Sequence, residues 1–380
     1  MRYITLLLLF VAVNALHAQK KMDELFSEKL NAKRTFTVTL PPLYDQNKDK
    51  IYPLILLLDG EYLTGPFEGT LAYTTYWDEL PEAIIVGVNQ NYANQREDDS
   101  RVSEETGLPD TTGDNFFQFL GQELVPYLQK NYRVSPYKVI AGHDVTATMA
   151  SFFLYREKSP FTGFIAFSPV MAAEMETRLP EMLATSKSPV FFYLCTAEGD
   201  SPKLRKKIKV LDQNIKAIKN PNVKYLFEDF TAGTHYSLVP YGTPGALYNI
   251  FASYRPISPI EYKDKIETLK SGYVDYLKNK YDIIEKDLGV KMVIRLADFK
   301  AIEAAIKRNG MYDELQDLAS LAKKNYPKKT IGEYYEGLYF EMTGDLKRAK
   351  KSYMNGYGLS PIGEYTKDFM VEKGESVKTQ

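Results

Sequence analysis

Five consecutive residues near the middle of the chain have the types and spacing of a nucleophile elbow. They are Gly142, His143, Asp144, Val145 and Thr146; a short apolar run precedes them and residues at helical spacing follow. In the hydrolase form of this motif, G-x-S-x-G, a strained turn between strand and helix exposes a serine hydroxyl. Here the central residue is a carboxylate, which accepts hydrogen bonds but cannot be deprotonated to an alkoxide. Thr146 is β-branched, stands where a small residue is expected, and should crowd the turn.

The histidine and the acid that would accompany an elbow can be sought from their order along the chain. Of the three histidines, His17 lies in an apolar leader, which leaves His143 and His235. A hydrolase triad of this kind runs nucleophile, acid, histidine, with the histidine after the last strand, and His235 fits that place. The preceding strand-like segment ends in acids, of which we prefer Asp200, with Glu198 as the alternative.

Strand-like segments alternate with helical ones over the first two thirds of the chain. Near-continuous apolar runs are typical of strands covered on both faces, as parallel sheets require. The runs are 52–60, 82–90, 137–142, 164–169, 190–196 and 223–230. Residues 36–44 predict an outer strand that ends at prolines, and 113–132 is the clearest helix. This alternation predicts an α/β fold with a doubly wound, mostly parallel sheet over residues 19–254.

Residues 255–380 have a different character, because strand signals vanish and helical segments rich in Lys, Glu, Tyr and Leu replace them. Gly310 and Gly344 are 34 residues apart, which is the length of a tetratricopeptide repeat. We therefore expect an all-helical domain with repeat-like units near 296–329 and 330–363. Such units could bind a protein partner or serve only in packing.

The first residues predict a secretory signal peptide, residues 1–18. Arg2 precedes an apolar run, and small residues lead to a cleavage site that we place after Ala18. The run is shorter than the roughly 20 apolar residues of a membrane span. The expected location is therefore periplasmic or extracellular. The single cysteine, Cys195, lies in an apolar run and is expected to be a buried small hydrophobe.

The amino-acid composition disfavours nucleic acid as a partner. The formal net charge is -1, with 44% hydrophobic and 26% charged residues, which is ordinary for a globular protein and gives no electrostatic footprint for nucleic acid. No cofactor is expected. His143, Asp144 and His235 do not predict a metal site, because adjacent residues in a turn point apart and no spaced ligand pattern accompanies them.

Several segments resemble those of a known family. They are TLPPLYD, YPLILLLDGE, IIVGV, the arginine of NQRED at Arg96, FLGQELVPYLQKNYRVSPYKVIAGH, FSPV and GTHYSLVP. The likeness spans most of residues 30 to 255. The chain resembles the putative esterase family of α/β-hydrolases, which includes ferric-siderophore (enterobactin-type) esterases and esterase D relatives. The resemblance implies ester hydrolysis, with the amides of Gly60, Glu61 and Val145 forming an oxyanion hole.

The chain departs from that family at the elbow, where a serine stands in place of Asp144. Ser168 does not replace the missing serine, because it follows a different strand; we expect it and His143 to line the pocket, or Ser168 to cap a helix. Glycines of the family are also replaced, by Thr146 and Ala147. Ordinary serine-esterase chemistry is therefore excluded by the residues of the elbow.

Three functions remain compatible with the sequence. The first, which we favour, is a pseudo-hydrolase that binds a small ester-like ligand, or a protein partner through its helical domain, without turnover. In the second, Asp144 is itself a nucleophile, as in haloalkane dehalogenases and epoxide hydrolases, whose elbows GHD resembles locally. In the third, His235 polarised by Asp200 activates water on an ester-like substrate.

Overall fold

A computed structural model describes residues 19–378, and the chain divides into two compact units. The first unit runs to Tyr254 and also includes Asp287–Val290; the second comprises Arg255–Lys286 and the chain from Lys291 onward. The expected signal peptide, 1–18, lies outside the described residues. Its cleavage and the location of the protein remain predictions.

The first unit is built on an eight-stranded sheet in the order β1-β2-β4-β3-β5-β6-β7-β8. The strands are β1 Gln19–Ser27, β2 Ala32–Leu40, β3 Tyr52–Leu57, β4 Ile84–Val88, β5 Val134–His143, β6 Gly163–Phe167, β7 Val190–Ala197 and β8 Val223–Phe230. β1 and β2 pair antiparallel, as do β2 and β4, whereas every other pairing is parallel. The sheet is thus mostly parallel, as its apolar strands predict.

Strand β1 is absent from the sequence-based prediction. Its residues, QKKMDELFS, are mostly exposed and mix charged with apolar side chains, so no buried face marks the strand in the sequence. The strand forms a hairpin with β2 and lies at the edge of the sheet, where lysines disfavour pairing with another chain. Tertiary pairing rather than local pattern therefore defines this element.

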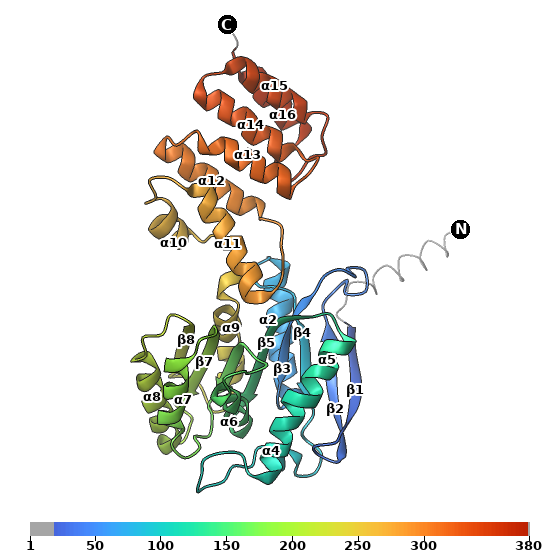
Figure 1. The fold of residues 1–380 in the computed structure, drawn as a ribbon, viewed down its shortest axis with the longest axis vertical. Helices are drawn as coiled ribbons and strands as arrows, with labels where there is room; N and C mark the ends of the chain where they lie inside the picture. The colour runs from blue at the N-terminus through green and yellow to red at the C-terminus, as the bar shows by residue number, and fades with distance from the viewer. Residues whose placement is uncertain (1–18, 379–380) are drawn as a thin grey trace, which may run out of the picture. The chain divides into compact units, whose positions relative to one another are not determined.

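Helices cover both faces of the sheet, as Figure 1 shows. α2 Gly60–Tyr76 and α9 Leu238–Ile250 pack together on one face. The other face carries α4 Thr111–Gln118, the π-helical turn η2 Phe119–Leu124, α5 Val125–Asn131, α6 Val145–Ser151, η3 Phe152–Tyr155, α7 Met175–Thr185 and α8 Pro202–Lys216. Short helices α3 Gln95–Asp99 and η4 Ala252–Tyr254 complete the unit. With both faces covered, the central strands form the buried core.

The second unit is helical. Its elements are α10 Pro259–Glu261, η5 Tyr262–Ile266, α11 Tyr273–Leu288, which begins in this unit, α12 Leu296–Asn309, α13 Glu314–Asn325, α14 Thr330–Thr343, α15 Leu346–Gly356 and α16 Lys367–Ser376. Gly310 and Gly344 end α12 and α14 in the left-handed conformation, so the 34-residue spacing marks equivalent helix ends. Assignment of these helix pairs as tetratricopeptide-like remains a prediction.

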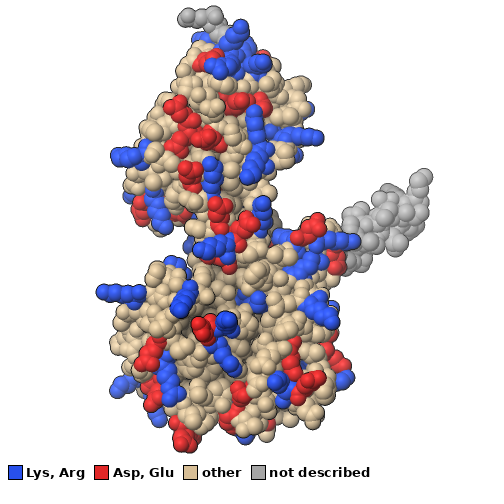
Figure 2. Space-filling model, viewed as in Figure 1, with Lys and Arg blue, Asp and Glu red and all other residues tan. Residues whose placement is uncertain are grey.

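Positive and negative side chains are interspersed over the face of the molecule seen in Figure 2. This distribution agrees with the near-zero formal net charge. Within residues 19–378, no helix has the length and apolar character that crossing a membrane requires.

Candidate functional site

The elbow is present in the structure, between β5 and α6. Asp144 joins the two elements with φ 60° and ψ -123°, a conformation that costs a non-glycine residue about 1–3 kcal/mol. Gly142 permits the turn, because a Cβ there would lie 2.5 Å from the backbone carbon of Thr146. Such strain persists only where the surrounding structure holds it, and it clusters at functional sites. Asp144 therefore occupies the position of the nucleophile in a hydrolase elbow.

His235 and Asp200 form a histidine–acid pair on the loops that follow β8 and β7. His235 Nδ1 lies 2.6 Å from Asp200 Oδ1. Asp200 Oδ2 accepts hydrogen bonds from Ser168 Oγ at 2.6 Å, Thr196 Oγ1 at 2.6 Å and the Ala197 amide at 3.0 Å. These three donors fix the carboxylate, and the carboxylate fixes the orientation of the imidazole.

The contact between His235 and Asp200 changes the pKa values of both residues. Burial opposes ionisation of Asp200, but the hydrogen bonds from His235, Ser168 and Thr196 outweigh it and hold the pKa of Asp200 well below its usual range. The hydrogen bond to Asp200 raises the pKa of His235, against burial and the charge of Arg96. His235 is therefore easier to protonate than a free histidine.

Asp144 lies between two basic groups. Its Oδ2 is 3.5 Å from Arg96 Nη1, and its Oδ1 is 3.8 Å from His235 Nε2. The side chain of Asp144 is 26% exposed, so the carboxylate faces solvent as well. The structure thus brings together Asp144, His235 and Asp200, the three residues that chain order predicts for a triad.

A buried carboxylate that the sequence does not single out, Asp59, holds Arg96 and Thr146 of the elbow in place. It is 1% exposed and accepts hydrogen bonds from Arg96 Nε at 2.7 Å, Tyr62 Oη at 2.7 Å and Thr146 Oγ1 at 2.6 Å. Asp59 lies two residues after the end of β3, at the carboxyl end of a central strand, which is where ligand sites of parallel sheets lie. This position after a predicted central strand is the feature of the sequence that could have indicated Asp59 as a site residue. Asp59 holds Arg96 in place to reach Asp144.

His143 is a supporting residue rather than the pocket-lining one that we expect from the sequence. It is buried; its Nε2 donates to the carbonyl oxygen of His235 at 2.9 Å, and its Nδ1 lies 3.1 Å from Tyr62 Oη. The rings of His143 and His235 are 4.6 Å apart. Burial, and then the nearby His235, lower the pKa of His143. The neutral ring thus supports the loop that carries His235.

Two further expectations, on Ser168 and Thr146, require correction, and the structure distinguishes the two candidate acids. Ser168 caps no helix and lines no pocket wall: it is buried and donates to Asp200. Of the two candidate acids, the preferred Asp200 contacts His235, whereas the alternative, Glu198, is exposed on the loop after β7. Thr146 does not crowd the turn, because its hydroxyl donates to Asp59 and accepts the His143 amide at 2.9 Å.

The residues expected to form an oxyanion hole lie at two helix starts. Val145 begins α6, and Gly60 and Glu61 begin α2, so their amides have no acceptor within their own helices. Gly60 packs closely on β4, because a Cβ there would lie 2.4 Å from the carbonyl carbon of Gly87. The Glu61 carboxylate accepts the Gln90 amide at 2.7 Å. The role of these amides in catalysis remains a prediction.

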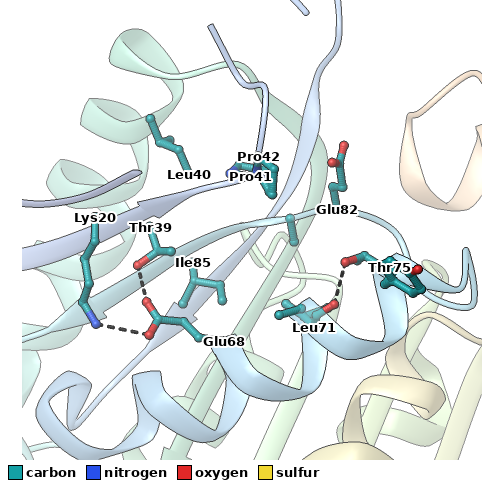
Figure 3. A pocket seen from close by; sticks show the side chains of 13 residues that line it. Lys20, Thr39, Leu40, Pro41, Pro42, Glu68, Leu71, Thr75, Glu82 and Ile85 are labelled. Atoms are coloured by element: carbon teal, nitrogen blue, oxygen red, sulfur yellow. Dashed lines mark hydrogen bonds and ion pairs between the residues drawn. The ribbon is translucent and has the colours of Figure 1, made fainter. Parts of the chain in front are cut away.

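Among the cavities of the first unit, two lie at different distances from Asp144 and His235. A small apolar one of about 160 Å³ adjoins the elbow and is lined by Ser100, Val102, Val145, Thr148, Val170 and Ala172. A larger one of about 620 Å³ lies along the second half of α2, where Figure 3 shows Glu68 bonded to Lys20 and Thr39. The larger cavity contains neither Asp144 nor His235, so we assign the site by its chemistry and not by its volume. Among residues 19–378, no group of three His, Cys, Asp or Glu side chains could hold a metal ion.

Comparison with known proteins agrees with this geometry. Residues 27–213 match the family model described as "Putative esterase". The chain belongs to that family. A search of curated proteins found no match.

Two solved structures resemble this chain in fold. An uncharacterised protein from Capnocytophaga ochracea is 29% identical, with a TM-score of 0.84 over 94% of this chain and 99% of that one. That coverage includes helices of the second unit. An IroE-like serine hydrolase from Shewanella oneidensis is 17% identical, with a TM-score of 0.59 over 80% of this chain and 99% of its own. At that identity the likeness shows the fold alone.

Proposed function

We propose that this esterase-family protein binds a small molecule at its elbow and does not hydrolyse esters through a serine acyl-enzyme. The observation that carries the proposal is the position of the Asp144 carboxylate, at the nucleophile site and between Arg96 and His235. A carboxylate has no proton for His235 to remove. Its charge also opposes the oxyanion that an esterase must stabilise at the same place.

The contacts that position Asp144, His235 and Arg96 are all present, which supports a ligand-binding site rather than a site that has lost its function. The strained φ of Asp144 is retained, and both His235 and Arg96 are fixed by buried carboxylates. The small apolar cavity beside Val145 adds a place for a nonpolar group. Pockets with an apolar wall and a few placed polar groups are typical of ligand sites.

The test compares the native protein with an Asp144→Ser variant. We expect no fluorophosphonate labelling and no p-nitrophenyl acetate turnover above background in the native protein. Asp144→Ser should gain both, because His235 is already oriented to deprotonate an elbow serine. We expect turnover at least about a hundredfold above native, a fraction of the roughly 10⁴–10⁶ that complete triads contribute.

Asp144→Ser combined with His235→Ala is the matched control and should lose the gained activity. Adding Thr146→Gly should reduce the gain, because Thr146 donates to Asp59. This reverses what the sequence predicts for that position. Labelling of the native protein at another serine, with ester turnover that survives Asp144→Ala, would overturn the proposal. If that turnover also disappears in His235→Ala, histidine-activated water becomes the explanation.

A second function is favoured by the order and spacing of Asp144, His235 and Asp200. An Asp144 oxygen could attack the sp³ carbon of an alkyl halide or epoxide, displacing halide or opening the ring. His235 would then take a proton from the water that hydrolyses the resulting ester. The contact with Arg96 weighs against it, because a paired carboxylate is a poorer nucleophile. Halide release or diol formation that disappears in Asp144→Asn would establish this function.

A further inference from the structure

We infer that the ligand of the elbow site carries a protonated amine, which Asp144 and His235 hold between them. The inference deepens the proposed function and rests on it. It names a chemical class, a primary or secondary ammonium joined to a small nonpolar group.

Two hydrogen-bond acceptors face each other in this site. His235 Nδ1 is directed at Asp200, 2.6 Å away, so it carries the proton of the neutral ring and leaves a lone pair on Nε2. The facing Asp144 Oδ1 is also an acceptor, 3.8 Å away. That distance exceeds a direct hydrogen bond, whereas a ligand nitrogen to one side of the line between the two atoms can lie about 2.9 Å from each. An ammonium group supplies the two N–H bonds that these acceptors need.

The balance of charge favours a cation over an anion. Asp59, Asp144 and Asp200 provide three carboxylates, against one permanent cation, Arg96. Arg96 donates to Asp59 through Nε and Nη2 and to the carbonyl oxygen of His143 through Nη2. Few of its N–H groups therefore remain for an anionic ligand. The site therefore has excess negative charge whether His235 is neutral or protonated. A ligand carboxylate would add to that excess, and a ligand ammonium would reduce it.

Aromatic side chains at the edge of the site also favour a cationic ligand. Tyr236 is 78% exposed, and its ring centroid lies 5.3 Å from that of His235. Tyr62, beside His143, is also exposed. Tyrosine faces attract ammonium groups and pack against nonpolar ones. The cavity of about 160 Å³ next to Val145 can hold a short nonpolar substituent.

Protonation of His235 competes with the ligand, since it places a hydrogen and a positive charge on Nε2. The groups that face His235 are Asp200 and Asp144, which raise its pKa, Arg96, which lowers it, and the ring of His143. The net result is a pKa above the usual value of 6.5. Ammonium binding should therefore be weak at acidic pH and strengthen as His235 loses its proton. Amines of ordinary basicity, with pKa values of about 9–10, remain cationic up to that range.

The experiment measures binding of benzylammonium, benzyl alcohol and benzoate to the purified protein by calorimetry, with methylammonium as a smaller cation. At pH 8.5 benzylammonium should bind more tightly than either isosteric probe. Its affinity should fall at least about tenfold at pH 5.5, where the proton holds Nε2. Asp144→Asn should weaken it about tenfold or more at pH 8.5, the effect of removing one charge-assisted hydrogen bond. Glu97→Gln, an exposed change of equal charge in α3, should leave it unaltered.

Three results would overturn the inference. They are tighter binding of benzoate than of benzylammonium, equal benzylammonium affinity in Asp144→Asn, and binding of neither cation at tens of millimolar. Thermal melting of Asp144→Asn separates loss of binding from loss of fold, and Asp144→Ser provides a second, uncharged variant. Ester turnover by the native protein would contradict the proposed function without changing these affinities, so the two failures are distinguishable.

Discussion

The site has a histidine half, formed by His235 and Asp200, and an elbow half, formed by Asp144, Arg96 and Asp59. In each half a buried carboxylate orients a basic side chain, but the two halves suit different chemistry. In the histidine half, Asp200 is buried, receives three donors besides His235, and orients the imidazole as in a working relay. In the elbow half, a second buried carboxylate, Asp59, orients Arg96 toward Asp144. One half is ready to remove a proton from a nucleophile, while the other presents a carboxylate that has none.

This contrast shows that the fold and the reaction are set by different residues. The strained turn, the helix start at Val145 and the His235–Asp200 pair all remain with an aspartate at the elbow. The identity of one side chain, Asp144, then decides whether the geometry can form an acyl-enzyme. A family fold with a histidine–acid pair is therefore not sufficient evidence of ester hydrolysis.

The largest expected effect is that of Asp59→Asn, which removes the carboxylate that supports the elbow half. The change leaves the Arg96 guanidinium, which is mostly buried, without its bidentate partner. Breaking such a pair costs about 3 kcal/mol or more of the free energy of unfolding. Urea denaturation followed by the fluorescence of Trp77, the single tryptophan and part of the first unit, measures it.

Asp98→Asn is the matched control, because its pairing with Arg101 is largely exposed. Exposed ion pairs contribute about 0–1 kcal/mol, so the control should change stability by no more than that. Equal losses in Asp59→Asn and Asp98→Asn would show that Asp59 does not organise the elbow.

Asp200→Asn tests the histidine half. We expect a loss of about 2–3 kcal/mol at pH 7, because hydrogen bonds to a buried charge are replaced by weaker ones. The pKa of His235 should also fall, which ring-proton NMR titration measures. A histidine pKa that stays at its native value would mean that Asp200 is not the group that raises it.

The pH dependence of the free energy of unfolding gives a second test of the contact between Asp200 and His235. Folding lowers the pKa of Asp200, so its contribution is fully present above the unfolded pKa of about 3.9 and is lost as pH falls through the folded value. The raised pKa of His235 acts oppositely: its contribution is present below about 6.5 and is lost as pH rises through the folded value. Asp200→Asn should reduce both dependences in denaturation curves collected across pH.

The smallest effect distinguishes Thr146→Val from Thr146→Ser. Valine keeps the shape but removes the hydroxyl that bonds Asp59 and the His143 amide, and should cost about 1–2 kcal/mol. Serine keeps the hydroxyl and should cost less than about 1 kcal/mol. Thermal denaturation of the two variants measures the difference. If valine is as stable as serine, Thr146 contributes to the elbow by shape alone.

Features that depend on local order can be predicted from the amino-acid sequence. Apolar runs predict strands β3 to β7, because a strand buried on both faces needs apolar side chains throughout. Strand β8 is also predicted, although its side chains are mostly half-buried. The order of Asp144, the acid and His235 located the histidine half, because consecutive strands of this fold deliver their loops to the same edge of the sheet. The replacement of serine at the elbow was likewise legible, since chemistry that needs a hydroxyl fails without one.

Contacts between polar side chains from different elements, by contrast, depend on the folded structure. Asp200 rather than Glu198 pairs with His235, and Ser168 serves that acid instead of lining a pocket, because burial and direction depend on packing between distant strands. Asp59 and Arg96 are separated along the chain yet form one ion pair, which no local period predicts. Strand β1 is not predicted for the same reason, because its pairing with β2 and not a hydrophobic pattern in its own residues makes it a strand. Local periodicity follows from the backbone geometry of single elements, whereas these contacts depend on how elements distant in sequence pack together.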